Sequence, residues 1–154
     1  MGDAQLDSEQ YDDAIKSFDK ARGIFEAIGA EAEKELGYAY TRLGVAYAKI
    51  ANHAKAQEYF LTALPIYEKT YGTEDRKTAV VYNNIGTTHL WQENYTEAMP
   101  FLLKAYKFYL DKLGKEDAKT QETMRNIRRC YHYMGKNPAE FGFWLDCKLN
   151  PPQL

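Results

Sequence analysis

Small and aromatic residues recur along this chain at the spacing of one helix face. Around residue 60 they stand at Ala56, Phe60, Ala63 and Tyr67. Steps of four, three and four place all of them on one side of a helix with about 3.6 residues per turn. The preceding segment shows the same spacing, and no stretch alternates apolar and polar residues as a half-buried strand would. The pattern therefore predicts an all-α chain.

The helical pattern repeats every 42 residues. The aligned positions keep their size class: Gly2, Gly44 and Gly86; Tyr11, His53 and Tyr95; Ala14, Ala56 and Ala98; Phe18, Phe60 and Leu102; Ala21, Ala63 and Ala105; Phe25, Tyr67 and Tyr109. A pair of helices this size cannot bury its apolar side alone, so the copies must stack. The sequence predicts one domain over 1–154, an α-α superhelix of about three and a half helix-hairpin repeats at about 1–30, 31–73, 74–115 and 116–148.

Residues typical of helix ends agree with this division. Asn52 and Asn94 are suited to cap helix starts, with Glu97 three residues after Asn94 completing a capping box. Gly29, Gly72 and Gly114 stand where second helices should stop, because glycine tolerates the left-handed conformation of a helix C-terminus. The expected helices lie near 2–9, 11–28, 32–50, 53–71, 75–92, 95–113, 117–134 and 138–148.

Charge and composition exclude several kinds of partner. The chain has 154 residues, with 20 Lys and Arg against 22 Asp and Glu, so its formal net charge is -2. A field this small gives no reason to expect nucleic acid or an anionic membrane as the partner, and no apolar run approaches the ~20 residues of a membrane span. Cys130 and Cys147 are too few for a disulfide framework and indicate packed, reduced thiols. Because the polar N-terminus does not look like a signal peptide, we expect a cytoplasmic protein.

The sequence contains no recognisable catalytic or metal-binding motif. It has no HExxH, P-loop, GxGxxG or GxSxG pattern. His53, His89 and His132 are far apart, and the first two stand in aromatic columns that indicate packing. We therefore expect no enzyme activity, no metal and no cofactor.

These columns resemble the tetratricopeptide repeat (TPR). The family pattern places a small Gly in the first helix and Tyr, Ala, an aromatic residue and Ala along the second. It is met by Gly44, His53, Ala56, Phe60 and Ala63, and again by Gly86, Tyr95, Ala98, Leu102 and Ala105. The 42-residue length and the segments 63–72 and 82–86 resemble the kinesin-light-chain type of this family. The resemblance implies a TPR solenoid that acts as a non-catalytic scaffold for other proteins.

The resemblance assigns the first helix of each repeat to a concave groove that holds a partner peptide or helix. The candidate residues are Tyr38, Thr41, Arg42, Val45, Asn83, Asn84, Thr87, Leu90, Trp91, Arg125, Asn126 and Arg129. The amides of Asn83 and Asn84 could each satisfy one donor and one acceptor of an extended peptide. The alternative is that both are solvated surface residues.

The charges along the groove indicate an acidic partner segment. Asp3 and Asp7 lie in the first helix, whereas Arg125, Arg128 and Arg129 stand together in the last full one. Arginine grips carboxylates with two hydrogen bonds, so we expect acidic residues near an apolar or aromatic anchor that rests by Tyr38, Leu90 or Trp91. The alternative is that the arginines pair within the chain, with Glu122, Asp117 or Asp146.

Three features depart from the repeat pattern. The first copy starts partway through, so we expect the chain to be a piece of a longer repeat array or to begin with a trimmed cap. Arg128 replaces the small Gly of the fourth copy, which predicts looser packing there. The segment 138–148 is expected to form a capping helix with an aromatic face; alternatively Phe141, Phe143 and Trp144 mediate self-association. A further alternative function is a sensor or regulatory domain of a larger signalling protein.

Overall fold

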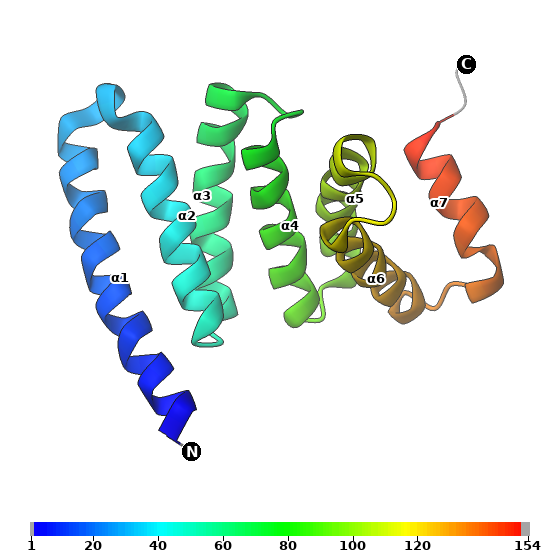
Figure 1. The fold of residues 1–154 in the computed structure, drawn as a ribbon, viewed down its shortest axis with the longest axis horizontal. Helices are drawn as coiled ribbons and strands as arrows, with labels where there is room; N and C mark the ends of the chain where they lie inside the picture. Colours follow the sequence, from blue (N-terminus) through cyan, green and yellow to red (C-terminus); the bar gives the residue numbers. More distant parts are fainter. Residues whose placement is uncertain (1, 152–154) are drawn as a thin grey trace.

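Every regular element of the described chain is helical in the computed structural model, which describes residues 2–151 and the side chains from Gln10 onward. The elements are α1 (Gly2–Ile28), the 3-10 turn η1 (Gly29–Ala32), α2 (Glu33–Lys49), α3 (His53–Tyr71), α4 (Arg76–Trp91), α5 (Tyr95–Leu113), α6 (Ala118–Tyr133), the 3-10 turn η2 (Pro138–Glu140) and α7 (Phe141–Leu149). Each of the first five helices packs against the next, so the helices form a row from the N-terminus to the C-terminus (Figure 1). The all-α solenoid is confirmed.

The helix ends follow the predicted signals with one exception. Gly29, Gly72 and Gly114 all have positive φ, at +81°, +86° and +86°, as expected for helix C-termini. The Asn52 side chain accepts a hydrogen bond from the backbone N–H of Lys55 at 3.2 Å. Asn94 makes no side-chain capping bond, so the capping box predicted at that helix start is wrong.

The N-terminal helix differs from the prediction. Two helices were expected, near 2–9 and 11–28, but α1 runs unbroken over both. At the equivalent turns of the next two repeats, Ala51 and Glu93 adopt positive φ of 59° and 62°, and each precedes an asparagine. The first repeat has Glu9 and Gln10 at these positions. Both residues favour helix interiors over caps, so nothing local stops the helix.

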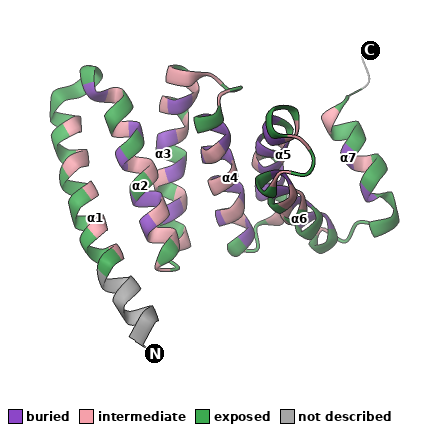
Figure 2. Cartoon of the chain, in the orientation of Figure 1, coloured by how far each residue is buried: buried purple, intermediate pink, exposed green. Residues whose placement is uncertain are grey.

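Glycines allow the two helices of each middle hairpin to approach closely. A Cβ atom added at Gly44 would lie 2.6 Å from Cε1 of Phe60, and one added at Gly86 would lie 2.6 Å from Cγ of Leu102. Any side chain at these positions would force the helices apart, because protein interiors are close-packed. The buried residues of α2 to α5 lie along these contacts (Figure 2).

The last two helices do not form such a close hairpin. Arg128 stands at the position of these glycines, and the backbones of α6 and α7 lie further apart than those of α4 and α5 (Figure 1). The aromatic rings of Tyr131 on α6 and of Phe141 and Trp144 on α7 pack between the two helices. The Arg128 guanidinium lies 5.0 Å from the centre of the Phe141 ring. Phe141 and Leu145 are buried against the last unit, whereas Phe143 is 77% exposed. The helix therefore covers the end of the core with part of its apolar surface only.

Two further findings concern the cysteines and membrane insertion. Both cysteines are free, Cys130 buried as expected and Cys147 exposed, so the expectation that both are packed is wrong for Cys147. Among the described residues, none of the helices combines the length and the apolar character that crossing a bilayer requires.

Candidate functional site

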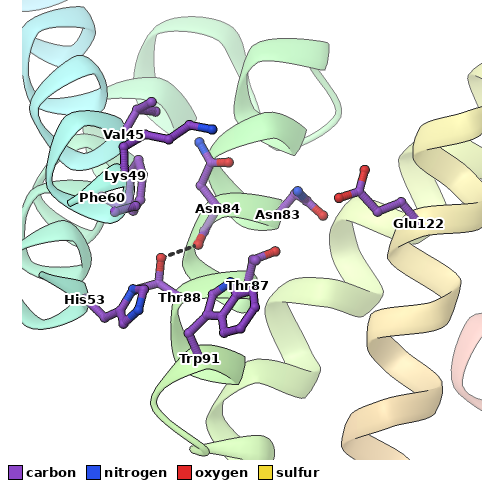
Figure 3. Close-up of a pocket in the computed structure, with 11 residues that line it drawn as sticks. Val45, Lys49, His53, Phe60, Asn83, Asn84, Thr87, Thr88, Trp91 and Glu122 are labelled. Atoms are coloured by element: carbon purple, nitrogen blue, oxygen red, sulfur yellow. Dashed lines mark hydrogen bonds between the residues drawn. The ribbon is translucent and has the colours of Figure 1, made fainter. Parts of the chain in front are cut away.

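A hollow of about 260 Å³ lies between α2, α4 and α6, with the start of α3 at one side (Figure 3). It is formed by the first helices of the second, third and fourth repeats, the elements that the resemblance assigned to the groove. Its walls are made by Val45, Ala48, Lys49, His53, Phe60, Asn83, Asn84, Thr87, Thr88, Trp91 and Glu122.

The two asparagines of α4 differ in their hydrogen bonding. Asn83 is tied to the neighbouring helix, because its Oδ1 accepts a hydrogen bond of 3.1 Å from the hydroxyl of Thr123 on α6. Asn84 is half-buried, and within the described chain its amide side chain makes no hydrogen bond. Figure 3 shows this amide projecting into the hollow. It can therefore offer both a donor and an acceptor to a bound chain.

Opposite charges stand on two sides of the hollow. Lys49 comes from α2 and Glu122 comes from α6, and Figure 3 shows the Glu122 carboxylate directed toward Asn83. A carboxylate of a bound segment is therefore attracted toward the α2 side and repelled at the Glu122 side. The hollow is polarised in the direction in which the helices stack.

Aromatic rings and a guanidinium form a stacked row at one end of the hollow. Trp91 is 58% exposed, and the ring of His53 lies parallel to it at 6.1 Å with an interplanar angle of 8°. The Arg129 guanidinium lies 5.6 Å from the Trp91 ring centre and 5.9 Å from that of Tyr133. Tyr133 in turn stacks on Tyr95 at 4.8 Å. We call these five residues the aromatic ledge.

The structure divides the predicted groove residues into separate groups. Val45, Asn83, Asn84, Thr87 and Trp91 surround the hollow, and Arg129 adjoins it through Trp91. Tyr38 and Arg42 instead belong to a cluster with Phe18 of α1, in which the guanidinium lies 5.6 Å from the Phe18 ring centre. Arg125 is exposed and Asn126 half-buried on α6, outside the walls of the hollow. The Thr41 hydroxyl donates to the Gly37 carbonyl oxygen at 3.0 Å.

The prediction for Leu90 is wrong. Leu90 is 2% exposed and belongs to a core that includes Ile127 of α6 and Leu102 of α5. On α4 it lies at the edge of the exposed face, where the following repeat packs over it. A side chain covered in this way cannot anchor a bound peptide, which leaves Trp91 as the large apolar surface on this part of α4.

The arginines of α6 do not pair within the described chain. The ion pairs of that part are Lys16–Asp13, Arg22–Asp19, Arg22–Glu26 and Lys69–Glu33. The alternative in which Arg125, Arg128 and Arg129 are neutralised by nearby carboxylates is therefore wrong there. Asp3 and Asp7, expected at the opposite end of the groove, lie outside the described side chains.

A half-buried histidine of α4 packs between α3 and α5. His89 stacks on Phe101 of α5 at 6.0 Å, and the Gln57 amide nitrogen of α3 contacts its ring, 3.2 Å from Nδ1. Burial lowers the pKa of His89 below its ordinary value. In the described part of the chain, no three His, Cys, Asp or Glu residues are grouped as a metal site would require.

Six wall residues are missing from the candidates of the sequence analysis: Ala48, Lys49, His53, Phe60, Thr88 and Glu122. Lys49 and Glu122 stand at helical spacing from candidates on the same helices, four residues after Val45 and three before Arg125, and the resemblance places both on the concave side. His53 begins a second helix and was interpreted as packing only. Its stacking on Trp91 depends on how α3 and α4 meet, which no sequence signal gives.

The family described as tetratricopeptide repeat matches this chain over residues 1–69 and again over residues 35–111. Comparison with curated proteins gives no match.

Solved structures show a similar fold. BtubC (BKLC) from P. vanneervenii has a TM-score of 0.74 at 17% identity, over 96% of this chain and 59% of that one. The chain therefore spans less than two thirds of that protein. TPR-like repeats from Podosopora anserina, named after a kinesin light chain, have a TM-score of 0.65 at 15% identity, covering 94% of this chain and 72% of theirs. A variant of these repeats has a TM-score of 0.67 at 15% identity, covering 94% and 70%.

Proposed function

Because this chain belongs to the tetratricopeptide repeat family, whose folds typically serve as non-catalytic protein-interaction scaffolds, we propose that it binds a segment of a partner protein in the hollow between α2, α4 and α6. The bound segment lies across the three helices in an extended conformation. It has an aromatic or apolar residue near Trp91 and acidic residues near the basic side chains around it.

The observation that carries this proposal is the unpartnered amide of Asn84 in the hollow, beside an exposed tryptophan. An extended peptide needs partners for its backbone N–H and C=O groups, and a half-buried amide supplies both. Trp91 is held between His53 and Arg129, so its orientation is fixed before a partner arrives. Less conformational entropy is then lost on binding.

The charges favour acidic residues at defined places in the segment. Arg125 and Arg129 have no carboxylate within ion-pairing distance in the described chain, so a partner carboxylate gains a charge-assisted bond without breaking one. Glu122 repels a carboxylate at the α6 wall of the hollow. The acidic residues therefore flank the centre of the bound segment, near Lys49 on one side or the arginines on the other.

Peptide-array binding tests this proposal. We expect the purified protein to retain acidic peptides that contain an aromatic residue, and the double variant Arg125→Glu/Arg129→Glu to lose them by at least ten-fold. Lys112→Glu is the matched control, since it removes an exposed cation from α5 and should leave retention unchanged. Unchanged retention by the double variant would rule out the electrostatic part. Unchanged retention by Asn84→Ala would rule out the backbone contact.

Self-association through 138–148 is a second candidate, favoured by the exposure of Phe143. Light scattering over a concentration series, with and without residues 138–154, tests it.

We also place the protein in the cytoplasm, a proposal supported by its two free cysteines, since thiols persist in reducing compartments.

A further inference from the structure

A cavity separate from the hollow lies where the end of α6 meets η2 and the start of α7 (Figure 1). Its volume is about 480 Å³, against about 260 Å³ for the hollow, and the two share no wall residue. We call it the terminal pocket. Its walls are made by Arg128, Tyr131, His132, Pro138, Phe141 and Gly142.

Two packed aromatic rings give the terminal pocket a fixed apolar surface. Tyr131 of α6 is 3% exposed and Phe141 of α7 is 6% exposed. Their ring centres lie 5.2 Å apart with an interplanar angle of 74°, so the edge of one ring meets the face of the other. Because both side chains also belong to the core of the last unit, their positions do not depend on a ligand.

The turn that closes the terminal pocket is held by hydrogen bonds. The Asn137 Oδ1 atom accepts from the backbone N–H of Ala139 at 3.1 Å, and the Asn137 Nδ2 atom donates to Glu140 Oε1 at 3.1 Å. Pro138 follows Asn137, and its ring fixes one backbone angle of the turn. The pocket is therefore formed before a ligand arrives, so binding loses less conformational entropy.

The charge on the pocket walls is positive. The Arg128 guanidinium lies 5.0 Å from the centre of the Phe141 ring and, in the part of the chain that the structure describes, forms no ion pair. His132 adds a ring nitrogen that can donate a hydrogen bond, and none of the six wall residues is acidic. A guanidinium that stacks on a ring still presents its N–H groups at its edge. The terminal pocket therefore favours a carboxylate next to an apolar group.

The size of the terminal pocket fits a small molecule. Ligand cavities in proteins span about 300–1,000 Å³ and combine apolar walls with a few polar groups. Gly142 leaves part of the space free, because a Cβ atom added there would meet nothing within 4 Å. All six walls come from one short stretch, residues 128–142, so the pocket encloses a compact ligand rather than a length of chain.

We propose that the terminal pocket binds a small organic acid in which a planar apolar group carries a carboxylate. Arg128 donates two hydrogen bonds to the carboxylate, and His132 is the second donor at the rim. The planar group lies against the rings of Phe141 and Tyr131, in the space beside Gly142. This site takes a different class of ligand from the hollow and does not depend on the function proposed for it.

The probe is 2-naphthoate, which has a flat apolar body and one carboxylate. We expect it to bind the full chain with a dissociation constant of about 1 mM or lower, measured by an NMR titration of the backbone amides. The amides of residues 128–142 should shift, and those around the hollow should not. The matched control ligand is 2-naphthamide, which has the same shape without the charge and should bind at least five-fold more weakly.

Two variants test the two halves of the site. Arg128→Gln removes the positive charge from an exposed residue and should weaken 2-naphthoate binding at least five-fold; Arg125→Gln, on the same helix outside the pocket, should leave it unchanged. Gly142→Leu places a side chain in the free space and should abolish binding, with an unchanged circular dichroism spectrum. Gly23→Leu is its control, because a Cβ there also meets nothing within 4 Å.

Four results would overturn the proposal. The first is a dissociation constant for 2-naphthoate well above ~1 mM, which is weaker than specific binding requires. The second is equal affinity for 2-naphthoate and 2-naphthamide, and the third is equal affinity of the parent, Arg128→Gln and Gly142→Leu for 2-naphthoate. The fourth is tighter binding of acetyl-Gly-Gly-Phe with a free terminal carboxylate, which would assign the pocket to the chain terminus of a partner protein.

Discussion

The hairpin α4/α5 and the pair α6/α7 occupy equivalent places in successive repeats, yet they pack differently. Gly86 allows Leu102 to lie against α4, and both residues are buried. In the next repeat Arg128 takes the place of Gly86, and Trp144 stands 42 residues after Leu102. Trp144 is half-buried and contacts Tyr131 at 4.8 Å between ring centres.

The difference shows how one residue sets the distance between two helices. A glycine leaves room for a side chain of the opposite helix to fill, and close packing then joins the two helices into one unit. An arginine cannot be buried there without losing the hydration of its charge. Arg128 instead extends over the face of Phe141, and large aromatic side chains rather than a glycine contact fill the space between α6 and α7. The last pair therefore closes the core from the end.

Converting the close hairpin into the loose one has the largest expected effect. Gly86→Arg places a side chain where Leu102 already lies, and we expect it to lower the free energy of unfolding by about 3 kcal/mol or more, at the upper end of overpacking. Urea denaturation followed by circular dichroism measures this. Gly23→Arg is the matched control, because a Cβ there meets nothing within 4 Å, and it should be neutral or slightly stabilising. Equal losses for both variants would contradict the role of close approach.

The two phenylalanines of α7 differ in burial: Phe141 packs against the core, whereas Phe143 is exposed. Phe141 is 6% exposed, and we expect Phe141→Ala to cost about 2–3 kcal/mol, slightly less than a typical core phenylalanine because it lies at the end of the chain's core. Phe143 is 77% exposed, so Phe143→Ala should change stability by less than about 0.5 kcal/mol. Thermal denaturation of the two variants side by side checks this. A large loss at Phe143 would show that α7 packs on another surface in solution.

Removing the arginine from the loose pair should have a small effect. Arg128→Ala keeps a good helix former and removes the contact with Phe141, which is worth about 0.5–1 kcal/mol as a cation–π interaction. We expect part of this loss to be recovered as α7 moves toward α6. The fluorescence of Trp144, recorded in a Trp91→Phe background, should shift to the blue. An unchanged spectrum would mean that Arg128 does not hold the helices apart.

The smallest expected effect is a dependence of folding stability on pH that comes from one histidine, His89. His89 stands at the position of Tyr47 and Tyr131 in the neighbouring repeats, and burial lowers its pKa. The unfolded chain therefore binds a proton more readily than the folded one, so stability is present above the ordinary pKa of about 6.5 and is lost as pH falls through it. Urea midpoints at pH 7.5 and 5.5 should differ less in His89→Gln than in the parent. An equal difference would assign the acid sensitivity to other groups.

Most of the fold could be predicted from the sequence, and the failures have physical reasons. The helices at 53–71 and 95–113 have the predicted ends, because capping positions and glycines are local signals. The turn expected near residue 10 does not form. It was predicted from the repeat register alone, and the first repeat lacks the asparagine that follows the turn residue in the next two repeats. The prediction that Leu90 lies in the groove was wrong because the next repeat covers the side of α4 on which Leu90 stands.

The candidate site was less predictable than the fold. Helical spacing identified the face that carries Val45, Asn84 and Trp91, since residues three, four and seven apart share one side of a helix. It could not tell that Asn83 is tied to Thr123 while Asn84 is not, because that depends on where α6 crosses α4. The stacking of His53 on Trp91 joins the start of α3 to the end of α4, two residues that are far apart in sequence although their helices are consecutive.

The sequence by itself determined the repeat length, the helical class and the positions at which helices must approach closely. These properties depend on local backbone preference and on the period of apolar residues, and both can be read directly from the order of residues in the chain. Only the tertiary structure decided which side chains remain available: the amide of Asn84, the unneutralised arginines of α6 and the exposed isoleucines Ile24 and Ile28 of α1. Availability depends on what the neighbouring helices cover, and that is settled by their relative placement in space.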